Sequence, residues 1–218
     1  MPLISEQDQD VLRNEFADKV VNPVKMLMFT QETECQFCAE TRQIVQEVAA
    51  LSEHITAEVY DFVADEEMVD LYGIDKIPAI VILGLDDTDY GVRFYGIPSG
   101  YEFTSLIEDI IDVSKGESGL SAKTKEKVAA IDQPVHIQVF VTPTCPYCTQ
   151  AVRLAHKLAI ESSHIRGDMV EAIEFPHLAN KYHVHGVPRS VINETIHQEG
   201  ALPEPMFVAK LMEALEHK

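Results

Sequence analysis

Two Cys-x-x-Cys pairs carry the clearest chemistry in this sequence. Cys35-Gln36-Phe37-Cys38 and Cys145-Pro146-Tyr147-Cys148 together hold all four cysteines of the 218-residue chain. Two thiols at this spacing can close a disulfide with each other, or they can supply half of a metal site. Residues 39–144 separate the pairs, far more than the roughly 12 to 20 residues of familiar zinc spacings. We therefore expect two redox dithiols and no metal.

The segments around each pair predict how the sulfurs are presented. An apolar segment typical of a strand, 24–29 or 135–141, precedes each pair, and a segment with helical periodicity follows it. A helix begins with free N–H groups and a positive dipole end, and both favour a thiolate. We expect Cys35 and Cys145 to be the attacking thiolates, and Cys38 and Cys148 to be the resolving thiols.

The two halves of the chain repeat each other. At one constant offset, both cysteine pairs, Tyr72 with Tyr182, and Ile77-Pro78 with Val187-Pro188 align. Beyond a hairpin that is shorter in the second half, Gly96 aligns with Gly200. This pattern predicts a tandem duplication, with units at 1–116 and 117–218 joined at a polar Gly/Ser segment.

Each half has the same predicted order of elements: helix, strand, helix, strand, helix, two hairpin strands and a closing helix. Parallel crossovers combined with a hairpin predict an α/β fold with a central mixed sheet flanked by helices. On the opening helix of the first half, Val11, Leu12 and Phe16 are expected to share one apolar face. The expected ranges are helices 5–20 and 122–131, second strands 55–62 and 169–175, hairpins 79–83 with 91–95 and 190–192 with 195–198, and closing helices 102–113 and 204–216.

Pro78 and Pro188 stand at the same distance downstream of the two cysteine pairs. A proline at the start of a strand is usually trans, but its recurrence at one point of both repeats favours a cis bond. A cis bond at Ile77-Pro78 and Val187-Pro188 would offer an apolar ledge with open backbone groups. A substrate peptide could add there as a strand.

The charge balance excludes several classes of partner. With 36 Asp and Glu against 17 Lys and Arg, the formal charge is −19, which repels nucleic acid and anionic membrane surfaces. No apolar run is long enough to span a membrane, and the first residues lack a secretory signal, so a cytoplasmic protein is expected. No glycine-rich nucleotide motif is present. We therefore expect no cofactor, and electrons delivered by a reductase or a small thiol.

The Cys-Pro-Tyr-Cys motif followed by Val187-Pro188 resembles glutaredoxin. The doubled unit, including the stretch 89–103, resembles the glutaredoxin-like protein disulfide oxidoreductases, which carry two thioredoxin folds, each with a C-x-x-C. The resemblance covers nearly the whole chain. It implies a thioredoxin fold for each half, cis bonds at both prolines, and thiol–disulfide exchange with protein substrates.

The chain departs from the thioredoxin pattern around its cysteines. It has no Trp, and the position before each first cysteine holds Glu34 or Thr144. The buried Asp that thioredoxin has upstream of this cysteine is replaced by Phe or Val, so the proton acceptor for the resolving thiol is not identified. Glu58 and Glu171 are candidate substitutes, although we expect solvated carboxylates there.

The two dithiols are not expected to be equivalent. Three glutamates, Glu32, Glu34 and Glu40, surround the first pair against one Arg42, whereas residues 142–150 contain no carboxylate. Negative charge raises a thiol pKa, and its absence leaves the helix dipole unopposed. Cys145 is therefore expected to have the lower pKa and to be the faster nucleophile.

The expected function is protein disulfide oxidoreductase activity, with the C-terminal pair as the main site. One alternative is an electron relay to a peroxide-reducing enzyme. Another is a non-catalytic binding module, either metal-stabilised or a holdase using the Pro78 and Pro188 surfaces. His183 and His185 have metal-ligand character, but with no third ligand in sight we expect a solvated loop.

Overall fold

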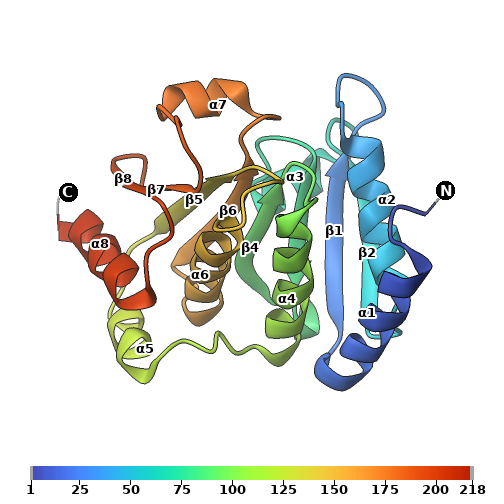
Figure 1. The fold of residues 1–218 in the computed structure, drawn as a ribbon, viewed down its shortest axis with the longest axis horizontal. Coiled ribbons are helices and arrows are strands. Elements are labelled where there is room, and N and C mark those ends of the chain that lie inside the picture. Colours follow the sequence, from blue (N-terminus) through green and yellow to red (C-terminus); the bar gives the residue numbers. More distant parts are fainter. Residues whose placement is uncertain (1, 217–218) are drawn as a thin grey trace.

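A computed structural model describes residues 2–216 as one eight-stranded sheet with helices on both faces (Figure 1). The first half contains α1 (Glu6–Lys19), β1 (Val24–Thr30), α2 (Cys38–Ala49), β2 (Ile55–Asp61), α3 (Glu66–Tyr72), β3 (Ala79–Leu83), the short 3-10 helix η1 (Leu85–Asp87), β4 (Asp89–Tyr95) and α4 (Tyr101–Lys115). The second half contains α5 (Ala122–Ala129), β5 (Val135–Val141), α6 (Cys148–Glu161), β6 (Ile165–Glu171), α7 (Pro176–Lys181), β7 (Arg189–Ile192), β8 (Ile196–Glu199) and α8 (Glu204–Glu216).

The strand order is β2-β1-β3-β4-β6-β5-β7-β8, so each half supplies four neighbouring strands. Within a half, the first strand pairs in parallel with the second and antiparallel with the third, which forms a hairpin with the fourth. Strands β4 and β6 then pair in parallel across the junction, with Val92 opposite Gly167. The mixed α/β class expected from the sequence is confirmed, and the two sheets are continuous.

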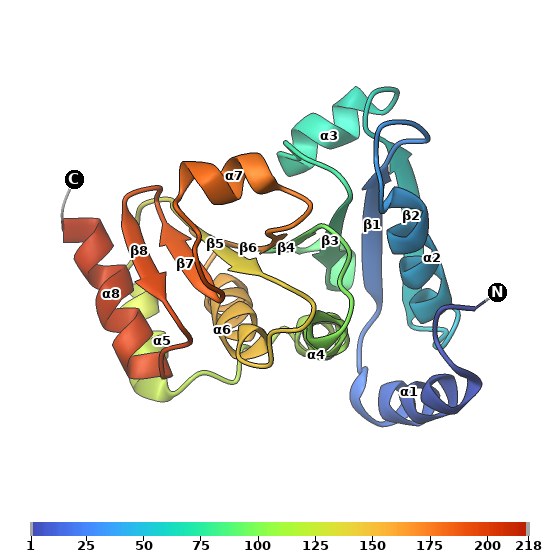
Figure 2. The same cartoon turned by 45° about the horizontal axis from the view of Figure 1, so that its top comes forward.

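The helices divide between the two faces of the sheet. Helices α1, α2, α4, α5, α6 and α8 contribute buried apolar side chains to one core. Helices α3 and α7 cover the opposite face and pack against a second, smaller core (Figure 2). Each C-x-x-C therefore follows a central strand and opens a helix of the larger layer.

Two details of the expected elements are wrong. The second strand of the C-terminal half begins at Ile165 and ends at Glu171, because its parallel pairing with β5 starts at Val135 and stops at Val141. The apolar Ile173 and Phe175, which suggested a later strand, lie in the turn that leads into α7, and Ile173 is 69% exposed. On α1, Leu12 and Phe16 are buried as expected, but Val11 is 58% exposed.

The junction of the two halves is reinforced by α4 and α6, which pack side by side. Arg153 of α6 is almost fully buried and forms ion pairs with Glu108, Asp109 and Asp112 of α4. The fully buried His156 contacts Asp109 through Nδ1 at 2.6 Å, and burial lowers its pKa to about 3. Neutral His156 and the charged cluster therefore tie the two helices together inside the protein.

The end of α4 at Lys115, capped by Gly116 in a left-handed conformation, coincides with the expected joint. The division into units at 1–116 and 117–218 stays a prediction, since the sheet itself runs through both. None of the helices within residues 2–216 is both long and apolar enough to cross a membrane.

A substitution at Gly91 tests whether the close approach of β4 to β6 contributes to stability. A Cβ atom at this position would lie 2.7 Å from the Ile165 carbonyl oxygen, and its φ is +77°. Gly200 has a similar φ of +73°, but nothing lies within 4 Å of a Cβ atom there. In urea unfolding, we expect Gly91→Ala to lower the free energy of unfolding by about 1–3 kcal/mol more than Gly200→Ala, because of overpacking. Equal decreases in the free energy of unfolding for the two variants would mean that the close approach of β4 to β6 does not contribute to stability.

Candidate functional site

The second dithiol lies where β5 ends and α6 begins. Cys145 and Cys148 form a disulfide with their Cα atoms 5.4 Å apart, and Cys148 is the first residue of α6. Cys145 Sγ lies 3.7 Å from the carbonyl oxygen of Val187, and the Val187-Pro188 peptide bond is cis. The structure therefore brings together all four residues expected at this site.

The first dithiol has the same arrangement. Cys35 and Cys38 form a disulfide with Cα atoms 5.5 Å apart, and Cys38 opens α2. The Ile77-Pro78 bond is also cis, and the carbonyl of Pro78 accepts a hydrogen bond from the Gly96 N–H at 2.9 Å. Cys35 is half-buried, whereas Cys145 is only 8% exposed. The first sulfur of the N-terminal pair is thus the more accessible one.

The charges around the two pairs differ, although less simply than the sequence suggested. Arg42 forms an ion pair with Glu32 at 2.8 Å, which leaves Glu34 and Glu40 as the uncompensated carboxylates near the first pair. Arg153, the nearest basic residue to the second pair in the sequence, is bound to the carboxylates of α4. Its charge is therefore compensated, and the helix N-terminus remains the main source of positive potential at Cys145.

Glu102 is a residue of the second site that the sequence did not reveal. It lies in the first turn of α4, in the first half of the chain, and is 1% exposed. Burial raises its pKa, while a hydrogen bond from the Ser105 hydroxyl (2.7 Å) acts in the opposite direction. The Thr149 hydroxyl donates to the carbonyl of Tyr101, the residue before Glu102, at 3.0 Å. Thr149 directly follows Cys148, so the first half supplies a buried carboxyl next to the second dithiol. In the sequence, this residue is an ordinary acidic residue at a helix start.

Glu171, the last residue of β6, is another buried carboxyl. The sequence favoured a solvated side chain, but Glu171 is 3% exposed because the loop between β4 and α4 packs over the end of β6. Burial raises its pKa, and it accepts the Glu174 N–H at 2.7 Å. Burial also raises the pKa of Glu174, to about 7, and the charge of Glu171 adds to the shift. Glu58, in contrast, lies on the edge strand β2 and hydrogen bonds to Tyr60, as expected for a solvated carboxylate.

His183 and His185 are not arranged as ligands of a common metal site in the part of the chain that the structure describes. The rings of His183 and His185 stack with centroids 6.4 Å apart. Among residues 2–216, no group of three or more His, Cys, Asp or Glu side chains is placed to hold a metal ion. Both cysteine pairs instead have the geometry of disulfides at strand-to-helix turns.

Comparisons with known proteins agree with this geometry. The family described as "Thioredoxin domain" matches residues 135–213. A protein disulfide oxidoreductase from Aeropyrum pernix superposes with a TM-score of 0.91 at 32% identity, covering 99% of this chain and 95% of that one. The NTD_N/C domain of alkylhydroperoxide reductase AhpF from Enterococcus faecalis superposes with a TM-score of 0.87 at 27% identity, covering 95% and 99% of the two chains.

Curated relatives are similar to this chain over only part of their length. The alkyl hydroperoxide reductase F protein from Pseudomonas aeruginosa is 22% identical over 196 residues, which is 90% of this chain and 35% of that protein. The chain spans about a third of the length of the curated relatives that it matches.

The charge difference between the pairs leads to a test of their thiols. We expect the pH midpoint for iodoacetamide alkylation of reduced Cys145 to lie below that of Cys35, because two uncompensated carboxylates flank the first pair. Mass spectrometry of each alkylated peptide against pH measures both midpoints. The midpoint reports the pKa of the thiol, whereas burial of Cys145 affects mainly the limiting rate.

The matched variant for this test is Glu34→Gln. Removing this carboxylate should lower the Cys35 midpoint and leave the Cys145 midpoint unchanged. A wild-type Cys35 midpoint at or below that of Cys145 would contradict the ranking.

Proposed function

Because the chain belongs to the family of glutaredoxin-like protein disulfide oxidoreductases and is a thiol–disulfide oxidoreductase, we propose that it reduces disulfides in protein substrates, with Cys145–Cys148 as the main site. The observation that carries this proposal is the second disulfide at the start of α6, with Cys145 Sγ beside the carbonyl of the cis Val187-Pro188 step. An extended substrate segment can pair with the backbone at that step while its disulfide meets Cys145.

The proposed exchange has two balanced steps. The Cys145 thiolate attacks one sulfur of the substrate disulfide, forms a mixed disulfide, and releases the other substrate sulfur as a thiolate that takes up a proton. Cys148, after losing its proton, attacks Cys145 Sγ, closes the intramolecular disulfide and releases the second substrate thiolate. Two electrons pass from the dithiol to the substrate. A reductase or a small thiol then reduces the Cys145–Cys148 disulfide, and no cofactor is required within this chain.

In the second step, Glu102 is our proposed acceptor for the proton of Cys148. Its buried carboxyl directly follows Tyr101, whose carbonyl accepts the hydroxyl of Thr149, the residue after the resolving cysteine. Burial raises its pKa, which makes it a stronger base than an ordinary carboxylate. The three glutamates near the first pair are all exposed. We propose that Cys35 and Cys38 exchange disulfides more slowly or pass electrons to the second pair.

An electron relay to a peroxide-reducing enzyme is a second proposed function. The superposition with the NTD_N/C domain of AhpF supports it, because that domain belongs to an alkylhydroperoxide reductase. In this role the partner would be a peroxiredoxin, and its disulfide would take the place of a general protein substrate. The test is to mix the reduced protein with peroxide and a bacterial peroxiredoxin. Oxidation of the protein that depends on peroxide and is faster than its oxidation by insulin would favour the relay. The expected cytoplasmic location stays a prediction.

Insulin reduction driven by dithiothreitol tests the main proposal. Cys145→Ser should lower the rate about threefold or more, because a pKa one unit lower raises the thiolate fraction about tenfold and reduces the nucleophilicity of the thiolate about threefold. Cys35→Ser, the matched control, should lower it only slightly. Activity that survives Cys145→Ser but not Cys35→Ser would place the main site in the first half, and an inactive, folded and reduced wild type would contradict the function.

Glu102→Gln tests the proton acceptor in a protein whose first pair is Cys35→Ser and Cys38→Ser. Oxidation of the remaining dithiol by oxidised glutathione should be slower than in the parent near neutral pH. The pH dependence of this rate should also lose the ionisation step that lies above the ordinary carboxyl pKa of 4.5, because Gln does not titrate. Glu66→Gln, an exposed acidic residue in the first turn of α3, is the control.

Stability gives an independent measurement on the same variant. A carboxyl whose pKa is raised by burial stabilises the fold below its unfolded pKa, and this stability is lost as pH rises through the folded pKa. The free energy of unfolding of Glu102→Gln should therefore decline less above pH 4.5 than that of the wild type. If the decline changes but the oxidation profile does not, Glu102 is a structural residue, and Glu171→Gln is the next variant to measure.

A further inference from the structure

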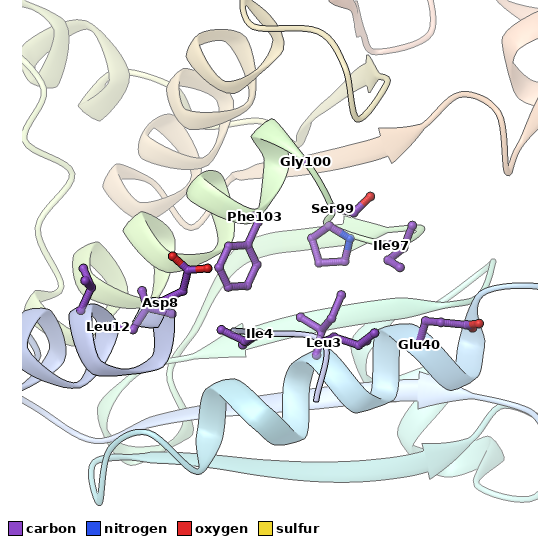
Figure 3. A pocket seen from close by; sticks show the side chains of 12 residues that line it. Leu3, Ile4, Asp8, Leu12, Glu40, Ile97, Ser99, Gly100 and Phe103 are labelled. Carbon is purple, nitrogen blue, oxygen red and sulfur yellow. The ribbon is translucent and has the colours of Figure 1, made fainter. Parts of the chain in front are cut away.

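An open groove lies beside the first dithiol and takes no part in the exchange at Cys145. It is bounded by the N-terminal segment with α1, by the start of α2, and by the loop at residues 96–100 between β4 and α4. Figure 3 shows Leu3 and Ile4 on one side of this space, and Ile97 and Phe103 on the other. Its volume is about 550 Å³, large enough for several side chains of an extended peptide.

The lining of the groove is apolar and partly exposed. Leu3 is 49% exposed and Val11 58%, although both lie beside the buried Ile4 and Leu12. Contiguous apolar surface that is open to solvent is typical of binding surfaces. Val11 therefore departs from the apolar face expected on α1 because it faces the groove and not the core.

The charges along the groove have one sign. Among the described residues that line it, the charged ones are Asp8 and Glu40, and no Lys or Arg lines it. Glu34 adds an exposed carboxylate near Cys35, and the whole chain has a formal charge of −19. This potential favours a ligand with basic side chains and repels acidic ones.

The groove adjoins the helix that the first dithiol opens, and the loop on its other side extends toward the second dithiol. Glu40 lies in the first turn of α2, which Cys38 opens. The 96–100 loop begins at Gly96, whose N–H binds the carbonyl of the cis-proline Pro78. Directly after this loop, the Tyr101 N–H donates to the carbonyl of Pro143 at 3.1 Å, two residues before Cys145. A segment in the groove is therefore held against a loop that contacts both redox sites.

We propose that this groove docks an extended segment of the protein substrate, one that carries apolar side chains and a lysine or arginine, next to the disulfide reduced by the first dithiol. The apolar side chains would cover Leu3 and Val11, and the basic side chain would lie between Asp8 and Glu40. This inference rests on the proposed function, because it assigns the occupant to a disulfide substrate. The groove would allow the first half to select its substrate, which the cysteine pair alone does not do.

Binding of a defined peptide to the disulfide form tests the groove without any redox step. The probe is a fluorescein-labelled nonapeptide with alternating leucines and a central lysine, compared by anisotropy with a version in which glutamate replaces the lysine. The wild type should bind the lysine peptide more tightly. Val11→Arg should weaken that binding about tenfold or more and reduce the preference for lysine, since it removes an apolar contact and adds repulsion.

Leu71→Arg is the matched control. Leu71 is 69% exposed on α3, on the opposite face of the sheet, and its substitution should leave the peptide affinity unchanged. Both positions are exposed, so both variants are expected to fold, and circular dichroism checks this. The same change in affinity for both variants would overturn the groove as the binding site.

Other outcomes also decide the proposal. Equal affinity of Val11→Arg and the wild type, or a preference of the wild type for the glutamate peptide, would overturn it. A wild-type dimer that Val11→Arg dissociates in ultracentrifugation would make the groove a contact between two copies. Insulin reduction without peptide binding would overturn the docking site alone. Peptide binding without insulin reduction would overturn both the function and the assignment of the occupant to a substrate.

Discussion

The parallel pairing of β4 with β6 is the constraint on which the rest of the molecule depends. It joins two four-stranded sheets into one and removes an exposed edge from each half, where unpaired N–H and C=O groups would otherwise invite other chains. The pairing requires a close backbone approach at Gly91, and it fixes α4 against α6. The ion pairs of Arg153 and the contact of His156 with Asp109 then hold the helix pair in a single arrangement.

This junction gives the two redox sites different surroundings even though their local geometry is the same. Because α4 lies beside α6, the Tyr101 carbonyl accepts the Thr149 hydroxyl, and the first half places the buried carboxyl of Glu102 beside the second dithiol. The same contact brings the 96–100 loop from Pro78 to Pro143. The first dithiol is flanked by exposed carboxylates and by an apolar groove.

Local features of the sequence predicted the fold well because they repeat and because they are encoded within short segments. The central strands, the position of each cysteine pair at a helix start, and the cis bonds at Pro78 and Pro188 all match the structure. The limits of β6 were missed because strand pairing, and not apolar content, decides where a strand ends. Glu102 and the burial of Glu171 could not be predicted, since both depend on contacts between halves that no pattern within one half records.

A duplication gives two identical sites only if each half keeps its own surroundings, and here the sheet pairing prevents that. The first half contributes a helix, a loop and a buried carboxyl beside the site of the second, whereas the second half contributes the Glu174 carboxyl group, which accepts the Ile97 N–H at 2.6 Å. Separating the halves would expose the edges of β4 and β6, and it would also break the hydrogen bond from Thr149 to the Tyr101 carbonyl beside Glu102. Thus the contact that makes the sheet continuous also surrounds the second dithiol with residues of both halves, and it leaves the groove of the first half open to solvent.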